Sequence, residues 1–280
     1  MNSQSPSSWH GILDLTYRFH QNSTQLKAAY SQAPFKIQRS FYPEGKQICH
    51  NTLLHTAGGM VGGDRLSQTL HLQPQTHAAI TTAAAAKAYR SNGQLAKQTL
   101  DITIDQNAYC EWIPRESIIF NGAIYRQDLR VNLAENARWL GWEITRFGRT
   151  ARGEQFITGD WRSCTEVWQN NRPLWIDRQG FSGGETIVNH PHGLGGQPIV
   201  ASLCYVGQPI SEEILKKARH LWNQSETKGE AGVTQLLSGL LCRYRGKSTQ
   251  EVIHWFTQVW QLLRQVQDKP VTVLPRVWKI

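Results

Sequence analysis

Cysteine is scarce in this 280-residue chain, and its spacing fits no cysteine-based scaffold. Five cysteines are spread along the chain without a CxxC pair: Cys49, Cys110, Cys164, Cys204 and Cys242. An odd number of widely spaced cysteines favours neither a disulfide framework nor a thiolate zinc knuckle. Because free thiols are typical of a reducing compartment, we expect a cytoplasmic protein.

Long segments of one character are also missing. No apolar run approaches the roughly 18 residues that a membrane span needs, and residues 1–9 lack the basic and apolar regions of a signal peptide. The net charge is +9, yet no run of five like charges forms a basic arm. We therefore expect neither a membrane nor a nucleic acid as partner, and a nucleic-acid-binding basic β-rich module is the alternative interpretation.

The residues offer no defensible catalytic site. There is no HExxH motif, and no Ser/His/Asp order can be assigned. Glu111 and Glu116 are separated by Pro114, so the two carboxylates have no fixed geometry for acid–base chemistry. Lys87 lacks the phosphate cup and pyridinium partner of a Schiff-base lysine. The sequence therefore indicates a protein that is not an enzyme.

Strand signals dominate residues 10–207. The composition, with 40% hydrophobic and 18% charged residues, allows an ordinary buried core. Apolar and polar residues alternate at 100–104 and at 129–133, and Asn170-Asn171 separates two apolar segments as in a hairpin. Frequent turn signals between short strands predict a mainly β fold, either a β-helix-like stack or layered β-sheets.

The last quarter of the chain has helical periodicity. Ser211 before two glutamates predicts a helix over residues 211–224. Ser248 and Glu251 form a capping-box pattern, which predicts a second helix over residues 248–267, before Pro270. Residues 229–245 have no clear pattern. We expect a single domain over residues 1–280, β-rich at 10–207 and with a small helical addition within 208–280.

A glycine-rich segment at residues 55–64 (HTAGGMVGGD) is the most distinctive motif. Four glycines in six positions require a tight turn or a close backbone approach. The segment is not a phosphate loop, because Asp64 follows the last glycine where that loop has lysine. Asp64 either caps backbone N–H groups in a turn or supplies an oxygen ligand to a metal.

Histidines and cysteines form two loose groups of metal-ligand type. Cys49, His50 and His55 lie before the glycines, and His190 and His192 flank a proline. Their side chains suit nickel or zinc. The sequence alone leaves open whether either group binds a metal.

Six segments carry a family resemblance in order along nearly the whole chain. They are residues 38–45 (QRSFYPEG), 49–64 (CHNTLLHTAGGMVGGD), 81–91 (TTAAAAKAYRS), 112–123 (WIPRESIIFNGA), 142–156 (WEITRFGRTARGEQF) and 275–278 (PRVW). Together they resemble the signatures of the UreD (UreH) family of urease accessory proteins. Thr56-Ala57 replaces a Pro-Pro pair of that family, Ala83 replaces a proline, and Asn121 replaces an aspartate.

The resemblance implies a non-catalytic scaffold that helps to build the nickel centre of urease. It implies a complex with UreF and the GTPase UreG on apo-urease, with a dimer of UreD–UreF–UreG units as one assembly it allows. No cofactor is expected to stay bound, and nickel would pass in transit.

Three acidic residues are the candidates for such a nickel path: Asp64, Glu143 and Glu166. The alternatives are an ion pair of Glu143 with Arg146 or Arg149, and a solvent-facing position for Glu166. The resemblance also marks motif residues, namely Gly58, Gly59, Gly62, Gly63, Thr81, Thr82, Lys87, Tyr89, Gly122, Gly148, Arg149, Gly153, Glu154, Arg276 and Trp278.

Overall fold

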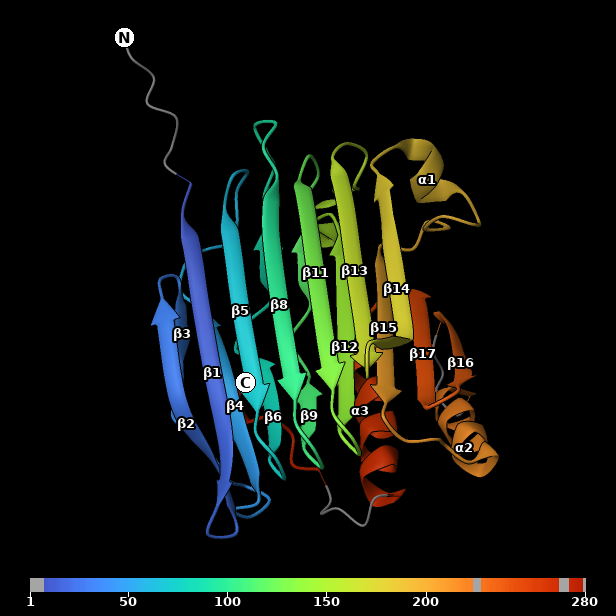
Figure 1. Ribbon diagram of the computed structural model, residues 1–280. Helices are drawn as coiled ribbons and strands as arrows, with labels where there is room; N and C mark the ends of the chain where they lie inside the picture. The colour runs from blue at the N-terminus through green and yellow to red at the C-terminus, as the bar shows by residue number, and fades with distance from the viewer. Residues whose placement is uncertain (1–7, 224–227, 267–271, 279–280) are drawn as a thin grey trace.

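Two large β-sheets face each other in the computed structural model, which describes residues 8–223, 228–266 and 272–278 (Figure 1). Sheet A has the order β14 (Arg172–Ser182), β13 (Asp160–Gln169), β11 (Ile124–Leu133), β8 (Ala96–Ile104), β5 (Arg65–Leu72), β1 (His10–His20), β2 (Ser23–Gln32). Sheet B has the order β16 (Glu230–Leu236), β17 (Gly239–Gly246), β15 (Ile199–Val206), β12 (Arg138–Phe147), β9 (Tyr109–Trp112), β6 (His77–Thr82), β4 (Ile48–His55), β3 (Phe35–Ile37). Two short strands, β7 (Ala86–Ala88) and β10 (Ser117–Ile119), pair with each other in parallel, and β10 also pairs with β12.

The chain winds between the two sheets like a β-helix. From β4 to β13 the main strands alternate between sheet B and sheet A, and neighbours within each sheet are parallel. Each turn therefore stacks on the previous one. This arrangement confirms the predicted mainly β fold. Of the two predicted forms, the structure has the β-helix-like stack.

The core lies between the inner faces of the sheets. Leu70, Ile102, Val131 and Val167 are partners in one register row across four strands of sheet A, and all four are fully buried. Apolar rows of this kind stabilise a parallel sheet by removing aliphatic surface from water. Polar side chains on the inner faces consequently stand out.

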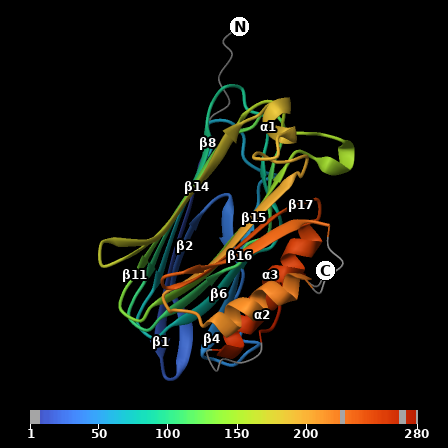
Figure 2. The same cartoon turned by 90° about the vertical axis from the view of Figure 1, so that its right-hand side faces the viewer.

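Two helices cover the outer face of sheet B, whereas no helix of the described residues covers the outer face of sheet A (Figure 2). They are α2 (Glu212–Asn223) and α3 (Thr249–Val266), which confirms both predicted helices. The hydroxyls of Ser211 and Ser248 accept bonds from backbone N–H groups in the first turns, at 3.4 and 3.2 Å. The capping box is only half formed. Ser248 N donates to the Tyr244 hydroxyl at 3.3 Å and not to Glu251, whose carboxylate instead accepts from the Tyr244 hydroxyl at 3.1 Å.

The unassigned segment at residues 229–245 forms most of the β16–β17 hairpin. Its sequence has no strict alternation, and pairing of β17 with β15 provides the missing strand signal. The C-terminal part at residues 208–280 thus contains two strands of sheet B in addition to the helices. Short helices occur at α1 (Glu185–Asn189), η1 (Thr150–Arg152) and η2 (Arg276–Trp278), and no helix of the described ranges is long and apolar enough to cross a membrane.

A buried ion cluster fixes α3 to sheet B. Arg264, near the end of α3, donates to both carboxylate oxygens of Glu111 at 2.5 and 2.6 Å, and to Glu44 at 2.7 Å. All three side chains are fully buried. Trp260 Nε1 also donates to Glu111 at 2.8 Å. Because a buried charge without a partner is costly, this cluster specifies where the helix docks.

Candidate functional site

Two neighbouring strands of sheet B, β6 and β9, end side by side, and the opening that they leave in the sheet is called the window. The alanine-rich segment at residues 81–91 bends at residues 83–85, between β6 and β7. The chain also leaves the sheet between β9 and β10. Thr82 Oγ1 accepts from Arg115 N at 2.9 Å and connects the two breaks. Residues 57–60, 83–86 and 113–117 define the window.

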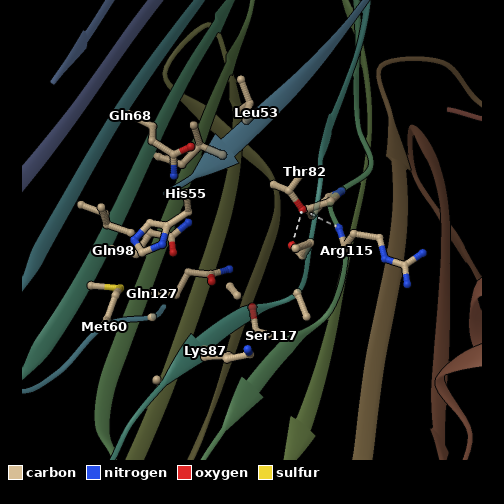
Figure 3. A pocket seen from close by; sticks show the side chains of 18 of the residues that line it. Leu53, His55, Met60, Gln68, Thr82, Lys87, Gln98, Arg115, Ser117 and Gln127 are labelled. Carbon is tan, nitrogen blue, oxygen red and sulfur yellow. Dashed lines mark hydrogen bonds between the residues drawn. The ribbon is translucent and has the colours of Figure 1, made fainter. Parts of the chain in front are cut away.

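A cavity of about 250 Å³ lies behind the window, between the two sheets (Figure 3). Its polar lining includes Thr82, Lys87 and Arg115 near the window, and His55, Gln68, Gln98, Ser117, Tyr125, Gln127, Glu143 and Thr145. Apolar residues such as Leu53, Met60 and Leu100 complete the wall. The exposed residues Gly58, Ala84 and Lys87 lie at the rim, where the cavity meets solvent.

A band of polar side chains continues from this cavity through the otherwise apolar core. In sheet A, one register row contains Gln98, Gln127, Ser163 and Gln179. In sheet B, one register row contains Glu143, Ser202 and Arg243. We call these seven residues the polar band. Each row runs across neighbouring strands, so the band follows the long axis of the β-helix.

Glu143 is the acidic member of the polar band. Its carboxylate accepts a bond from Gln127 Nε2 and another from the Ser163 hydroxyl at 3.1 Å. Burial raises the pKa of Glu143, and the nearby charge of Asp177 adds to this rise, whereas the bonds from Ser163 and Gln127 oppose it. The carboxylate is therefore held by neutral donors and not by a cation.

An ion pair closes the far end of the polar band, between β14 and β17. Arg243 donates to Asp177 at 2.7 Å and to the Ser202 hydroxyl at 3.2 Å. Gln179 Nε2 donates to the other Asp177 oxygen at 2.7 Å. The Arg243 side chain is 44% exposed and that of Asp177 is 11% exposed, so this end reaches solvent through Arg243.

Asp64 is buried in a turn and lies outside the cavity lining. Its carboxylate accepts from Val61 N at 2.8 Å and from Trp9 N at 3.4 Å, and the residue is 1% exposed. These bonds correspond to the capping interpretation. The metal-ligand interpretation of Asp64 gains no support from this geometry.

Glu166 lies on the outer face of sheet A, opposite to the polar band. It contacts Arg178 at 3.1 Å and Arg130 at 3.6 Å, and Trp168 Nε1 donates to it at 3.0 Å. Its neighbours along β13, Thr165 and Val167, are buried on the inner face. The structure thus does not bring the three acidic candidates together, and of these only Glu143 lines the cavity.

Neither group of cysteines and histidines forms a metal cluster. His190 and His192 are exposed, with ring centroids 5.4 Å apart. His50 Nε2 is 2.9 Å from a Glu44 oxygen, whereas Cys49 faces the core and His55 the cavity. Over residues 8–223, 228–266 and 272–278, no three side chains of His, Cys, Asp and Glu gather as metal ligands.

The motif residues gather mainly in two places. Gly58, Gly59, Thr81, Thr82, Lys87 and Tyr89 surround the window, and Trp278 reaches it through a 3.1 Å bond to the Thr81 hydroxyl. Gly59 is required there, because a Cβ atom at this position would lie 2.7 Å from the Lys87 carbonyl oxygen. Gly62 and Gly63 lie beside the loop at residues 91–95.

The second group lies near the end of β10 and includes Gly122, Gly148, Arg149, Gly153 and Glu154. Arg149 Nε donates to Glu154 at 2.6 Å, and the other Glu154 oxygen accepts from Asn121 N at 3.0 Å. Asn121 Oδ1 accepts from Ile157 N and from Thr158 N, both at 2.9 Å. An amide oxygen performs this role, which explains why no carboxylate is needed at position 121.

Most residues of the polar band are not predicted as site residues from the sequence. Gln98 shares its strand face with Leu100 and Ile102, and Gln127 shares its face with Leu129 and Val131. A glutamine in a row of core-facing residues is the available signal. Register between strands, which the sequence does not reveal, is needed to see that these residues meet.

Comparisons with known proteins agree with the resemblance. The model of the family described as UreD urease accessory protein matches residues 10–279. The urease accessory protein UreD of Nostoc sp. is 61% identical over 97% of this chain and 96% of its own length. The UreD proteins of Trichormus variabilis (60% identical, 99% of each chain) and Synechocystis sp. (40% identical, 91% of this chain and 95% of its own) agree. The chain belongs to the UreD family of urease accessory proteins, which are non-catalytic and serve urease maturation.

Proposed function

We propose that this chain carries nickel along its interior toward apo-urease, as part of a complex with UreF and the GTPase UreG. Family membership supports the link to urease maturation. The polar band, with Glu143 at its centre, is the single observation that supports an interior path. The nucleic-acid alternative is set aside, because the matched family consists of urease accessory proteins.

The donor chemistry of the band suits transit. Amide, hydroxyl and carboxylate oxygens are hard ligands, which bind Ni²⁺ less tightly than thiolate or imidazole groups do. A path must bind the ion strongly enough to admit it and weakly enough to release it. Gln127, Ser163 and Glu143 supply oxygens of these three classes within one hydrogen-bonded group. No bond of a substrate is made or broken in this exchange of ligands.

The charge at the window supports action within a complex. Lys87 is exposed at the rim, and Arg115 has one weak ion pair, 3.7 Å from Glu116. Both positive charges repel a free divalent cation. A docked partner that covers these charges with carboxylates would lower this barrier, which favours transfer of nickel within the complex over uptake from solution.

The proposal is tested by deleting this chain from cells that otherwise make urease and its accessory proteins. Urease purified from the deletion strain is expected to be assembled but depleted of nickel. Metal analysis of the purified enzyme measures this, and returning the chain on a plasmid is the control. A normal nickel content in the deletion strain would exclude the proposed function.

A further inference from the structure

His55 presents a ring nitrogen to the cavity without a hydrogen-bond partner. The residue ends β4, and its ring lines the cavity just inside the window (Figure 3). Nδ1 lies 3.0 Å from the carbonyl oxygen of Ala57. Because a carbonyl only accepts, Nδ1 must donate, and the neutral ring then has its lone pair on Nε2. Nε2 is buried and has no partner among the described residues.

The ring is also fixed in orientation. The bond to Ala57 sets one edge, and the rings of Trp9 and Phe35 pack at centroid distances of 5.7 and 6.2 Å. Metal-binding histidines usually donate their second ring N–H to a carbonyl or carboxylate, which fixes the tautomer and the direction of the lone pair. His55 has this arrangement, with Nδ1 held by the Ala57 carbonyl.

The surroundings of Nε2 offer further ligands. Met60 contributes a thioether to the same cavity, and Gln68 and Gln98 contribute side-chain amides (Figure 3). Imidazole is a borderline ligand that suits Ni²⁺, and amide oxygens or water complete a loose shell. A buried acceptor without a partner is costly, so a bound ligand would also stabilise this region.

The other two members of this sequence group are less suited to metal binding. His50 is engaged by Glu44, and burial raises the pKa of the Cys49 thiol, which keeps it from becoming a thiolate ligand. Of the three residues, His55 alone lines the cavity.

We infer that His55 Nε2 is the first protein ligand for a divalent cation of the nickel type after it enters the window. This inference rests on the proposed function, and it places an imidazole before the oxygens of the polar band. The cation would then exchange from His55 toward Glu143, which lines the same cavity.

The test measures binding of Ni²⁺ alone to the isolated full chain by calorimetric titration at neutral pH. His190→Gln with His192→Gln removes the exposed histidine pair and serves as the background. In this background, His55→Gln keeps a donor for Ala57 but removes the imidazole. The affinity for Ni²⁺ is expected to fall by more than about tenfold, the loss that removing even an outer-shell partner causes.

His71→Gln is the matched control, because His71 is paired with Asp105 at the outer face and lies outside the cavity lining. It should leave the affinity unchanged. Equal affinity of the His55→Gln variant and its background would overturn the inference.

A second measurement needs no substitution. Paramagnetic Ni²⁺ should broaden the ring signals of His55 in proton–nitrogen spectra of the unaltered chain at lower metal concentration than those of His71. Broadening of His71 without His55 would contradict the assignment. Both readouts are independent of urease, so this inference and the proposed function can fail separately.

Discussion

Glu143 and Glu166 are both acidic strand residues, but Glu143 lies on the inner face of sheet B and Glu166 on the outer face of sheet A. Glu143 faces the interior and is held by the neutral donors Gln127 and Ser163. Glu166 faces outward and contacts Arg130 and Arg178. The same residue type is thus an interior oxygen donor in one place and part of a surface ion network in the other. Surface pairs of this kind contribute little to stability.

Replacing Asp64 tests its role in the turn. Asp64→Ala leaves the N–H groups of Val61 and Trp9 without their acceptor and should lower the free energy of unfolding by about 1–3 kcal/mol. Asp64→Asn keeps one side-chain oxygen and should lose less. Urea unfolding measures both, with exposed Asp101→Ala as the control. An unchanged unfolding midpoint for Asp64→Ala would contradict the capping role.

The pH dependence of stability tests the burial of Glu143. Its pKa is raised in the folded protein, so ionisation costs stability as pH rises above the unfolded value of about 4.3. Glu143→Gln removes this cost and should be more stable than the unaltered chain at neutral pH. The advantage should disappear in acid, where both forms are uncharged. Thermal unfolding across the pH range measures it, and no advantage at neutral pH would argue against a buried carboxylate.

At the scale of elements, the attachment of α3 depends on charge pairing. Burial alone would raise the pKa of Glu111, but Arg264 and His77 outweigh it and hold the pKa far below its usual range. This carboxylate therefore stabilises the fold above the unfolded pKa, and the contribution is lost as pH falls toward the folded value.

Arg264→Met should destabilise the protein by about 3–5 kcal/mol at neutral pH, because it leaves Glu111 and Glu44 buried without their cation. The deficit should narrow in mild acid, where the unpaired carboxylates take up protons. Chemical unfolding at both pH values measures this. Lys216→Met, on the exposed face of α2, is the control. A deficit that does not change with pH would point to lost packing alone.

Local signals were sufficient to predict several elements. Ser211 and Ser248 mark the starts of α2 and α3, because a side-chain cap acts within one turn. Asn170 and Asn171 both have positive φ, which a tight hairpin turn requires. These features depend on neighbours in sequence, and the predicted starts of both helices agree with the structure within one residue, whereas their predicted ends at residues 224 and 267 lie outside the described residues.

Features that depend on register were not predictable from this sequence. The window arises because the paired strands β6 and β9 end side by side, although their ends are about thirty residues apart in the chain. The polar band likewise requires Gln127 to align with Gln98 and Ser163 on other strands. Only the polar residue within an apolar row is visible in the sequence.

At the scale of the whole molecule, pairing of the strands brings separate positions of the chain into one polar band. Each turn of the β-helix adds one strand to each sheet, and polar positions on neighbouring strands line up from the cavity to Arg243. The cavity behind the window lies at one end of the polar band and the Arg243–Asp177 pair at the other. A scaffold of this form can connect two partners bound at different places.

The nickel content of urease matured with altered chains tests this account most directly. Cells would carry Glu143→Gln, with Glu166→Gln as the matched control on the outer face, and co-purification with UreF would verify that each complex forms. If nickel takes an interior path, Glu143→Gln lowers the nickel content of purified urease, while Glu166→Gln leaves it at the level of the unaltered chain. Full nickel content with Glu143→Gln, or an equal loss with both variants, would contradict an interior path.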